Sequence, residues 1–126
     1  MFDISSIKPQ DTYDHIFGAS FDMYSWWGCV RAEWDQRGDA PDFWNVVVPI
    51  DDPYKDGPAL KMVVSHNILL GAMQRIADGR VSKYVSQYTY QECVSFLKDG
   101  PEHSDFDADS ADQVMQVATL GEVVYG

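Results

Sequence analysis

The spacing of hydrophobic positions along this chain changes near its middle. Between residues 24 and 64 the apolar residues gather in short runs rich in aromatic and β-branched side chains, as in strands. From residue 65 onward they recur every three or four positions, as on one face of a helix. This order predicts a single α+β domain, 1–126, with a small antiparallel sheet from about residues 24–64 packed against the helices of the second half.

Three strands are expected in the sheet. The segment 43–50, FWNVVVPI, has the clearest pattern, and Pro49 indicates a sheet edge or a strand end. The segment 24–34, YSWWGCVRAEW, contains Gly28, which indicates a bulge or a close approach of another part of the chain. The third strand is expected at 59–64. Two loops rich in turn-forming residues separate the strands: 35–41 and 51–58.

One short helix is expected before the strands and further helices after them. Pro9 suits the first turn of the short helix, whose apolar face would contain Tyr13, Ile16 and Phe17. Residues 81–88 also repeat at helical spacing, although serine and glutamine interrupt the pattern. The clearer helices of the second half are expected at 65–77, 89–98 and 110–120.

Capping residues predict the ends of these helices. Ser65 is expected to cap the first helix of the second half, and Gly79 to end it in a left-handed conformation. Thr89 and Glu92 match a capping box at the start of the next helix. After the last helix, the segment 122–125, EVVY, is expected as a closing strand that returns to the sheet.

Composition bounds the class of protein. With 45% hydrophobic and 13% aromatic residues, the chain has enough apolar material for a packed core. No stretch approaches the roughly 20 apolar residues of a membrane-spanning helix, and the N-terminal residues lack the pattern of a secretory signal. Cys29 and Cys93 are too few for a disulfide framework. We therefore expect a cytoplasmic protein that does not enter a membrane.

The net charge limits the kinds of molecule that the protein is expected to bind. Twenty Asp and Glu face nine Lys and Arg, which gives a formal net charge of −11, spread over both halves of the chain. Direct binding to nucleic acid or to an anionic membrane is not expected, because such binding depends on Lys and Arg. A basic protein, or one that normally handles nucleic acid, fits better. The alternative is that the acidity serves solubility alone.

The densest acidic stretch, DFDADSAD, precedes the last expected helix. Asp105, Asp107 and Asp109 have the alternating spacing of a calcium loop. However, Ser110 and Gln116 stand where an EF-hand requires glycine and glutamate. A looser site of oxygen ligands stays open as an alternative, but no metal or other cofactor is expected.

The same carboxylates suit the start of a helix. Anions stabilise a helix N-terminus by roughly 0.3–1 kcal/mol each, because they meet its unpaired amides and the positive end of its dipole. Asp109 or Ser110 is expected as the N-cap, with Gln113 completing a capping box and Asp112 in the first turn. The helix is apolar almost all round, which predicts a buried position.

A third interpretation is an acidic binding surface. Between Asp99 and Asp112 there are six acids and no base, and such a row can compete with nucleic acid for a basic groove. The residues expected on this surface are Asp99, Glu102, Asp105 and Asp107, extended by Asp51 and Asp52. Exposed tryptophans beside it would anchor a partner protein. The expected anchors, unless they fill the core instead, are Trp26, Trp27, Trp34 and Trp44.

Side chains for covalent chemistry are scattered along the chain. The two cysteines could act with His15, His66 or His103, yet no spacing brings any of them together. No nucleophile elbow, zinc-protease motif, P-loop or dinucleotide-binding fingerprint is present. Enzymatic activity is therefore not expected, and a small metal-dependent enzyme stays as an alternative.

The C-terminal stretch DADSADQVMQVATLGEVVYG resembles a signature of small actinobacteriophage and prophage proteins, generally of unknown function. The residues that carry the resemblance are Asp107, Ala108, Asp109, Ala111, Asp112, Gln116 and 121–126, with YSWW near residue 25 as a weaker likeness. The resemblance implies expression in the cytoplasm of a host cell and an accessory role, such as host takeover or counter-defence. It supplies no catalytic or binding residues.

These patterns lead to one expected function and one main alternative. The expected function is a non-enzymatic accessory protein that binds a host protein through an acidic surface with aromatic anchors. In its sharpest form the partner is a nucleic-acid-binding protein whose groove becomes occupied. The alternative is a phage structural or assembly component that forms homo-oligomers, with its closing segment paired with another subunit.

Overall fold

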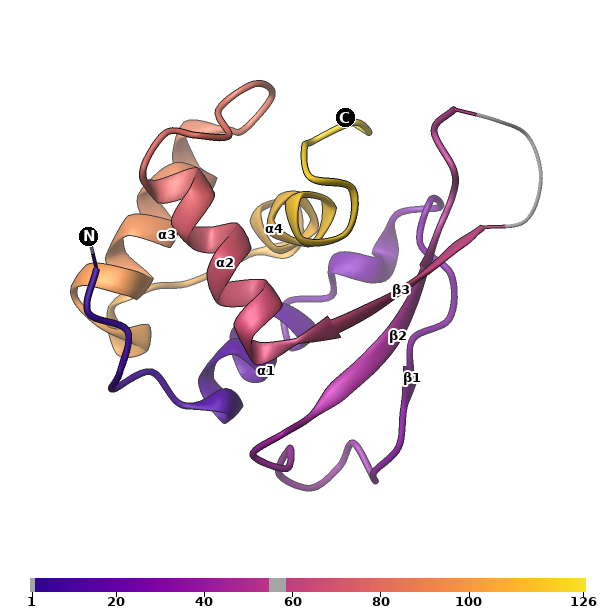
Figure 1. The fold of residues 1–126 in the computed structure, drawn as a ribbon, viewed down its shortest axis with the longest axis horizontal. Coiled ribbons are helices and arrows are strands. Elements are labelled where there is room, and N and C mark those ends of the chain that lie inside the picture. The colour runs from indigo at the N-terminus through magenta and orange to yellow at the C-terminus, as the bar shows by residue number, and fades with distance from the viewer. Residues whose placement is uncertain (1, 55–58) are drawn as a thin grey trace.

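The computed structural model describes residues 2–54 and 59–126, and its fold is α+β (Figure 1). The expected loop at 51–58 lies partly outside the described residues. The antiparallel strands, in the spatial order β1–β2–β3, are β1 Arg31–Ala32, β2 Asn45–Ile50 and β3 Leu60–Ser65. The α-helices are α1 Pro9–Phe17, α2 His66–Ala77, α3 Gln87–Lys98 and α4 Ala108–Leu120, and the short 3₁₀ helices are η1 Phe21–Met23 and η2 Pro101–His103.

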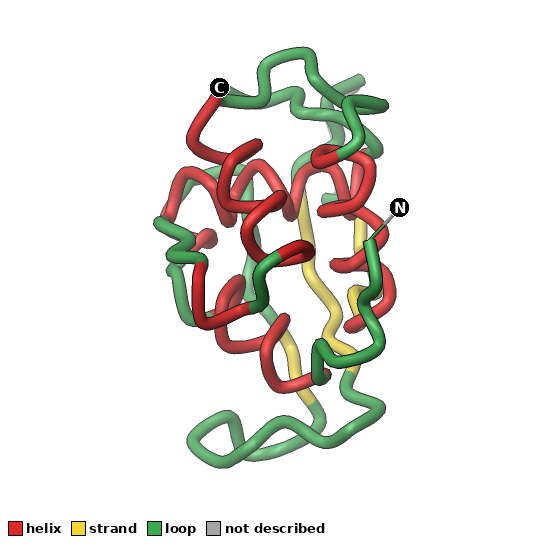
Figure 2. The backbone as a smooth tube through the Cα atoms, turned by 90° about the vertical axis from the view of Figure 1, so that its left-hand side faces the viewer, coloured by secondary structure: helices red, strands yellow, loops and turns green. Residues whose placement is uncertain are grey.

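The helices lie on one side of the sheet, and Figure 2 views the molecule from that side, with the strands behind. Alternation along β2 explains why. Val46, Val48 and Ile50 are buried, whereas Val47 and Pro49 between them are only partly buried. One face of the sheet therefore packs against the helices and the other faces outward, which confirms the predicted fold class.

The first expected strand is much shorter than predicted. Only Arg31–Ala32 pair with β2, and Trp27 forms an isolated bridge with Ile50. A Cβ atom on Gly28 would lie 2.8 Å from Cβ of Pro49, so the close approach predicted for this glycine is confirmed. The strand is interrupted because Trp26 and Trp27 direct their indoles to one carboxylate, whereas neighbours in a strand point to opposite faces.

Helix α4 is the central helix of the fold. It contacts α1, α2, α3, η1 and β3. The residues on its buried sides include Ala111, Val114, Met115 and Val117. The prediction of a buried helix is therefore confirmed. None of the described helices has the length and apolar character needed to cross a bilayer.

Helix α2 has the predicted ends. The Ser65 hydroxyl accepts a hydrogen bond from the backbone N–H of Ile68 at 3.4 Å, as an N-cap does. After the helix, Gly79 adopts a left-handed conformation with φ of 82°. Both signals are short-range, which is why they can be read without knowledge of the tertiary structure.

The segment between α2 and α3 is not helical, although the spacing of apolar residues at 81–88 predicted a helix there. Tyr84 has a φ of 64°, in the left-handed region, and this conformation breaks a right-handed helix. Helix α3 is capped by Ser86, whose hydroxyl accepts from the Thr89 backbone at 3.1 Å. The predicted Thr89 cap is therefore wrong. The Glu92 carboxylate accepts from the backbone of Asp105 instead, at 2.6 Å.

The predicted closing strand at 122–125 is also wrong, because these residues pair with no strand in the described part of the chain. The backbone N–H groups of Val124 and Tyr125 both donate to Oε1 of Gln116, at 2.8 Å each. Val123 is buried in the core. A side chain of α4 thus takes the place of the partner strand.

Candidate functional site

Acidic side chains converge where the N-terminal segment and α1 lie beside η2. A groove of about 430 Å³ separates these two parts of the chain. The acidic residues that line it are Asp3, Asp11, Asp99 and Glu102, and the basic ones are Lys8 and Lys98. The carboxylates thus outnumber the ammonium groups by two to one.

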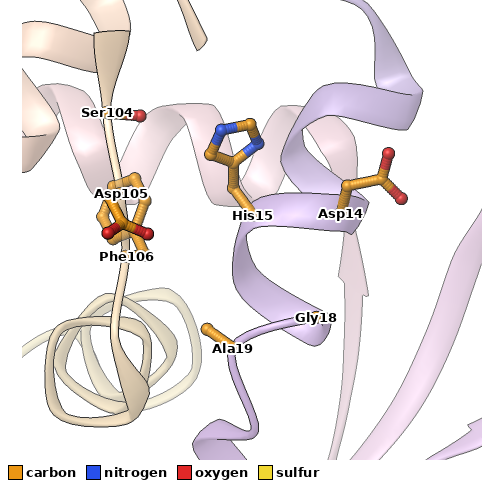
Figure 3. Close-up of a pocket in the computed structure, with 7 residues that line it drawn as sticks. All are labelled: Asp14, His15, Gly18, Ala19, Ser104, Asp105 and Phe106. Atoms are coloured by element: carbon orange, nitrogen blue, oxygen red, sulfur yellow. The ribbon is translucent and has the colours of Figure 1, made fainter. Parts of the chain in front are cut away.

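A second hollow, of about 220 Å³, lies between α1 and the segment before α4 (Figure 3). Helix α1 contributes Asp14 and His15 to it, and the segment before α4 contributes Asp105 and Phe106. In Figure 3 the carboxylates of Asp14 and Asp105 lie on either side of the His15 imidazole. We call the six acids of the two hollows the acidic face: Asp3, Asp11, Asp14, Asp99, Glu102 and Asp105.

His15 joins the two sides of the acidic face. Its Nδ1 lies 2.9 Å from the carbonyl oxygen of Asp11, and its Nε2 lies 2.9 Å from the carbonyl oxygen of Pro101. The ring also packs edge-on against Phe96, with centroids 5.1 Å apart. Carbonyl oxygens only accept, so a neutral ring donates to one of the two, and only a doubly protonated ring donates to both. The Asp11 contact lies within α1, and the Pro101 contact reaches from α1 to η2.

The carboxylates of the acidic face have few countercharges. Within the described residues, no Lys or Arg forms an ion pair with any of the six, and His103 lies 3.7 Å from Glu102. The pairs Arg37–Asp35 and Arg80–Asp78 are exposed and local, elsewhere on the molecule. Exposed charges of one sign act over roughly a Debye length, about 10 Å at 0.1 M salt, so this face attracts basic groups.

Three residues of the predicted acidic surface, Asp99, Glu102 and Asp105, lie on this face. Asp107 lines neither hollow and has a capping role, as Asp11 on the face also has at the start of α1. The carboxylate of Asp107 accepts from the Ser110 backbone at 2.8 Å, and the N–H of Asp107 donates to the Ser110 hydroxyl at 2.9 Å. This reciprocal pair is the N-cap of α4, so the cap is Asp107 and not Asp109 or Ser110 as predicted.

Asp51 and Asp52 do not extend the acidic face. They follow the end of β2, on the side of the molecule opposite η2 in Figure 1. The predicted single surface is therefore corrected. Asp3, Asp11 and Asp14 take their place and were missed by the sequence analysis. Their only signal was the spacing of Asp11 and Asp14 on one face of α1, and no local pattern reveals that this helix lies beside η2.

The predicted aromatic anchors also require correction. Trp44 is 2% exposed and Trp27 is 7% exposed, so both are core residues and cannot anchor a partner. Trp34 is partly buried and packs edge-on against Tyr13, with centroids 5.3 Å apart. Trp26 is partly buried between two parallel rings, Tyr24 at 4.8 Å and Tyr125 at 5.3 Å. The hydrophobic driving force places these large rings inside or against the core.

Asp112, on α4, accepts hydrogen bonds from two tryptophan side chains. It is 5% exposed. Its Oδ1 accepts from the indole of Trp26 at 2.9 Å and from that of Trp27 at 2.6 Å. Its Oδ2 accepts from the side-chain amide of Gln116 at 2.9 Å. Asp112 is thus a buried acceptor of three hydrogen bonds. It was predicted in the first helical turn but lies beyond it, because α4 begins two residues earlier than expected.

Gln116 extends this network to the C-terminal segment. Its amide nitrogen donates to Asp112 and also to the carbonyl oxygen of Tyr125, at 2.9 Å. Its amide oxygen accepts from the backbone of Val124 and Tyr125. We call the joined residues the C-terminal clasp: Trp26, Trp27, Asp112, Gln116, Val124 and Tyr125. The clasp gives four residues of the C-terminal stretch a structural role: Asp112, Gln116, Val124 and Tyr125.

The clasp makes stability depend on pH. Burial raises the pKa of Asp112 and outweighs the hydrogen bonds from Trp27, Trp26 and Gln116, which lower it. The folded state therefore binds this proton more readily than the unfolded state. The resulting stabilisation is present near the unfolded value of about 4 and is lost as the pH rises through the raised folded value.

We expect the free energy of unfolding to rise by more in the wild type than in an Asp112→Ala variant when the pH falls from 7 to about 4.5. Urea denaturation at both pH values measures this difference. Carboxylates common to the two proteins contribute equally, so the comparison isolates Asp112. Identical pH dependence in both proteins would contradict the expectation.

Asp, Glu, His and Cys side chains are the candidates for metal binding or covalent catalysis within the described residues. No group of three or more Asp, Glu, His or Cys side chains converges there in a way that could hold a metal ion. Cys93 is fully buried, and burial raises the pKa of its thiol, which makes it unreactive. His66 lies 2.8 Å from the hydroxyl of Thr12 and joins α2 to α1.

Comparisons of the chain with models of protein families, with curated proteins and with solved structures find no match. The acidic face and the C-terminal clasp are therefore interpreted from their own geometry.

Proposed function

We propose that this protein is a non-enzymatic binding protein whose acidic face docks onto a basic surface of another protein. One observation carries the proposal: six carboxylates line two hollows that both lie between the N-terminal part of the chain and residues 97–106, and no Lys or Arg of the described residues pairs with them. The sharpest form is a partner whose basic groove otherwise holds nucleic acid, because carboxylates in a row present charge as phosphates do.

The construction of the acidic face suits binding. His15 on α1 lies 2.9 Å from the carbonyl oxygen of Pro101, so the backbone segments that carry the carboxylates are positioned before a partner arrives, which lowers the entropy cost of association. Tyr88 supplies an aromatic ring at the border of the acidic face, 41% exposed, with its hydroxyl donating to the carbonyl oxygen of Asp105. Tyrosine is common among the residues that dominate binding energy.

The resemblance to phage and prophage proteins suggests the setting of this function. In a host cell, a protein that occupies the basic groove of a DNA-handling or RNA-handling protein would block its substrate. Such blocking fits host takeover or counter-defence, the accessory roles that the resemblance implies. We therefore infer that the protein acts as an accessory protein in the host cytoplasm.

An Asp99→Asn/Glu102→Gln variant tests the proposal. The wild type should retain a basic partner from host lysate at about 0.1 M salt and release it at about 0.5 M, because salt screens exposed charges. The variant should bind that partner at least about tenfold more weakly, which corresponds to roughly 1.4 kcal/mol. Affinity of the purified partner, measured by calorimetry with and without competing nucleic acid, gives the comparison.

The matched control is Asp51→Asn/Glu122→Gln, which removes two exposed charges away from the acidic face. It should bind the partner as the wild type does. Equal weakening by both variants would show that net charge alone matters, and the proposal would be rejected. Retention that is insensitive to salt would reject it as well.

A further inference from the structure

The outward face of the sheet has the opposite character from the acidic face. Arg31 on β1 pairs with Val47 on β2, which also pairs with Val63 on β3. Lys61 on β3 pairs with Pro49 on β2. We call these five residues the outer sheet face. Both views place the helices on the other side of the sheet (Figures 1 and 2).

This face exposes apolar area that a monomer normally covers. Val63 on β3 is 56% exposed, and its neighbour Val47 on β2 is partly exposed. Single exposed apolar residues are ordinary, but here Val47 and Val63 are cross-strand neighbours. The centre of the face is apolar, and the described part of the chain places no helix over it.

A small hollow of about 120 Å³ lies between the two basic side chains. Its lining is Cys29, Arg31, Val47, Pro49 and Lys61. Arg31 and Lys61 are both exposed, and neither forms an ion pair with another described residue. An apolar floor with a guanidinium and an ammonium group at its rim suits a carboxylate side chain, which arginine binds through two parallel hydrogen bonds.

We propose that the outer sheet face docks the acidic face of a second copy of this chain, with a carboxylate such as that of Glu102 held between Arg31 and Lys61. The inference rests on the proposed function, in that the acidic face must be a binding surface. Charge complementarity selects the occupant: the outer sheet face needs an acidic partner, and the acidic face needs a basic one.

The arrangement must be head-to-tail. A symmetric dimer through the outer sheet face would bring Arg31 and Lys61 of the two copies towards each other, which is repulsive. A head-to-tail contact instead leaves one free face at each end, so further copies can add. Because the same acidic face is used, self-association competes with the binding of any other basic protein.

Sedimentation velocity tests the inference with two neutralising variants, Arg31→Gln/Lys61→Gln and Asp99→Asn/Glu102→Gln. At about 0.1 M salt the wild type should form species that grow with protein concentration and dissociate at about 0.5 M. Each variant alone should associate at least tenfold more weakly. An equimolar mixture of the two should form a 1:1 dimer that grows no further, since each variant keeps one intact face.

The matched control, Arg37→Gln/Lys83→Gln, removes two exposed basic charges elsewhere and should associate as the wild type does. A wild type that stays monomeric at low salt overturns the inference. If that monomer still retains a basic lysate protein through its acidic face, the proposed function stands; if it retains none, both fail. Retention of an acidic lysate protein by Arg31 and Lys61, with no self-association, identifies a different occupant and overturns the inference too.

Discussion

Replacement of Asp112 by alanine is expected to lower the free energy of unfolding by about 3 kcal/mol. The change removes the acceptor of hydrogen bonds from Trp26, Trp27 and Gln116 at a site that is 5% exposed. Each buried donor left without a partner costs roughly 1–3 kcal/mol, and the relief of burying a carboxylate offsets part of the sum. Urea denaturation at pH 7, followed by tryptophan fluorescence, measures the loss.

The control for this variant is Asp109→Ala, which removes an exposed carboxylate from the first turn of the same helix. Its expected cost is below about 1 kcal/mol, the usual size of a charge–dipole interaction. Equal losses from the two variants would show that Asp112 acts only through the helix dipole. In that case the network with the tryptophans would contribute nothing.

Replacement of Gln116 by glutamate is expected to cost about 3–4 kcal/mol at pH 7, although the two side chains have nearly the same shape. The new carboxylate would face Oδ2 of Asp112 and the carbonyl oxygen of Tyr125, where the amide nitrogen now donates. Two buried carboxylates in contact repel each other, and an uncompensated buried charge costs about 3–5 kcal/mol. Protonation relieves the repulsion, so much of the loss should disappear at about pH 5.

Denaturation curves at pH 7 and 5 test this expectation, with Gln113→Glu as control. Gln113 lies on the same helix but is partly exposed, and its oxygen accepts from the backbone of Ser86 at 3.0 Å, which glutamate can also do. Hydrogen exchange at the amides of Val124 and Tyr125 should accelerate only in the Gln116 variant. Unchanged exchange there would show that the clasp does not hold the C-terminal segment.

The predicted elements that the structure confirms depend on signals within a few residues. The alternation in β2 and the Ser65 cap of α2 are of this kind. The errors arise where a distant contact competes with a local pattern. The C-terminal segment has strand-forming residues, but its backbone N–H groups donate to the side chain of Gln116 and not to a strand. The first expected strand is interrupted where Trp26 and Trp27 both donate to Asp112.

The acidic face also combines residues that local patterns predicted with residues that only distant contacts bring there. A row of acids beginning at Asp99 is visible in the sequence, and three predicted members lie on the face. The capping of α4 by Asp107 also involves only neighbouring residues. The sequence alone, however, does not distinguish this capping carboxylate from one that binds a partner. The contribution of Asp11 and Asp14 depends on the packing of α1, which contacts α2 and α4 and reaches η2 through His15.

The sequence by itself determined the order of strands and helices, most helix ends and the excess of negative charge, because periodicity, capping and composition are local or additive properties. The tertiary structure alone decided which carboxylates share a surface and which one is buried. Asp112 meets Trp26 and Trp27 across 86 and 85 residues of chain. Such contacts depend on how α4 packs into the core, and packing of that kind leaves no spacing pattern along the chain.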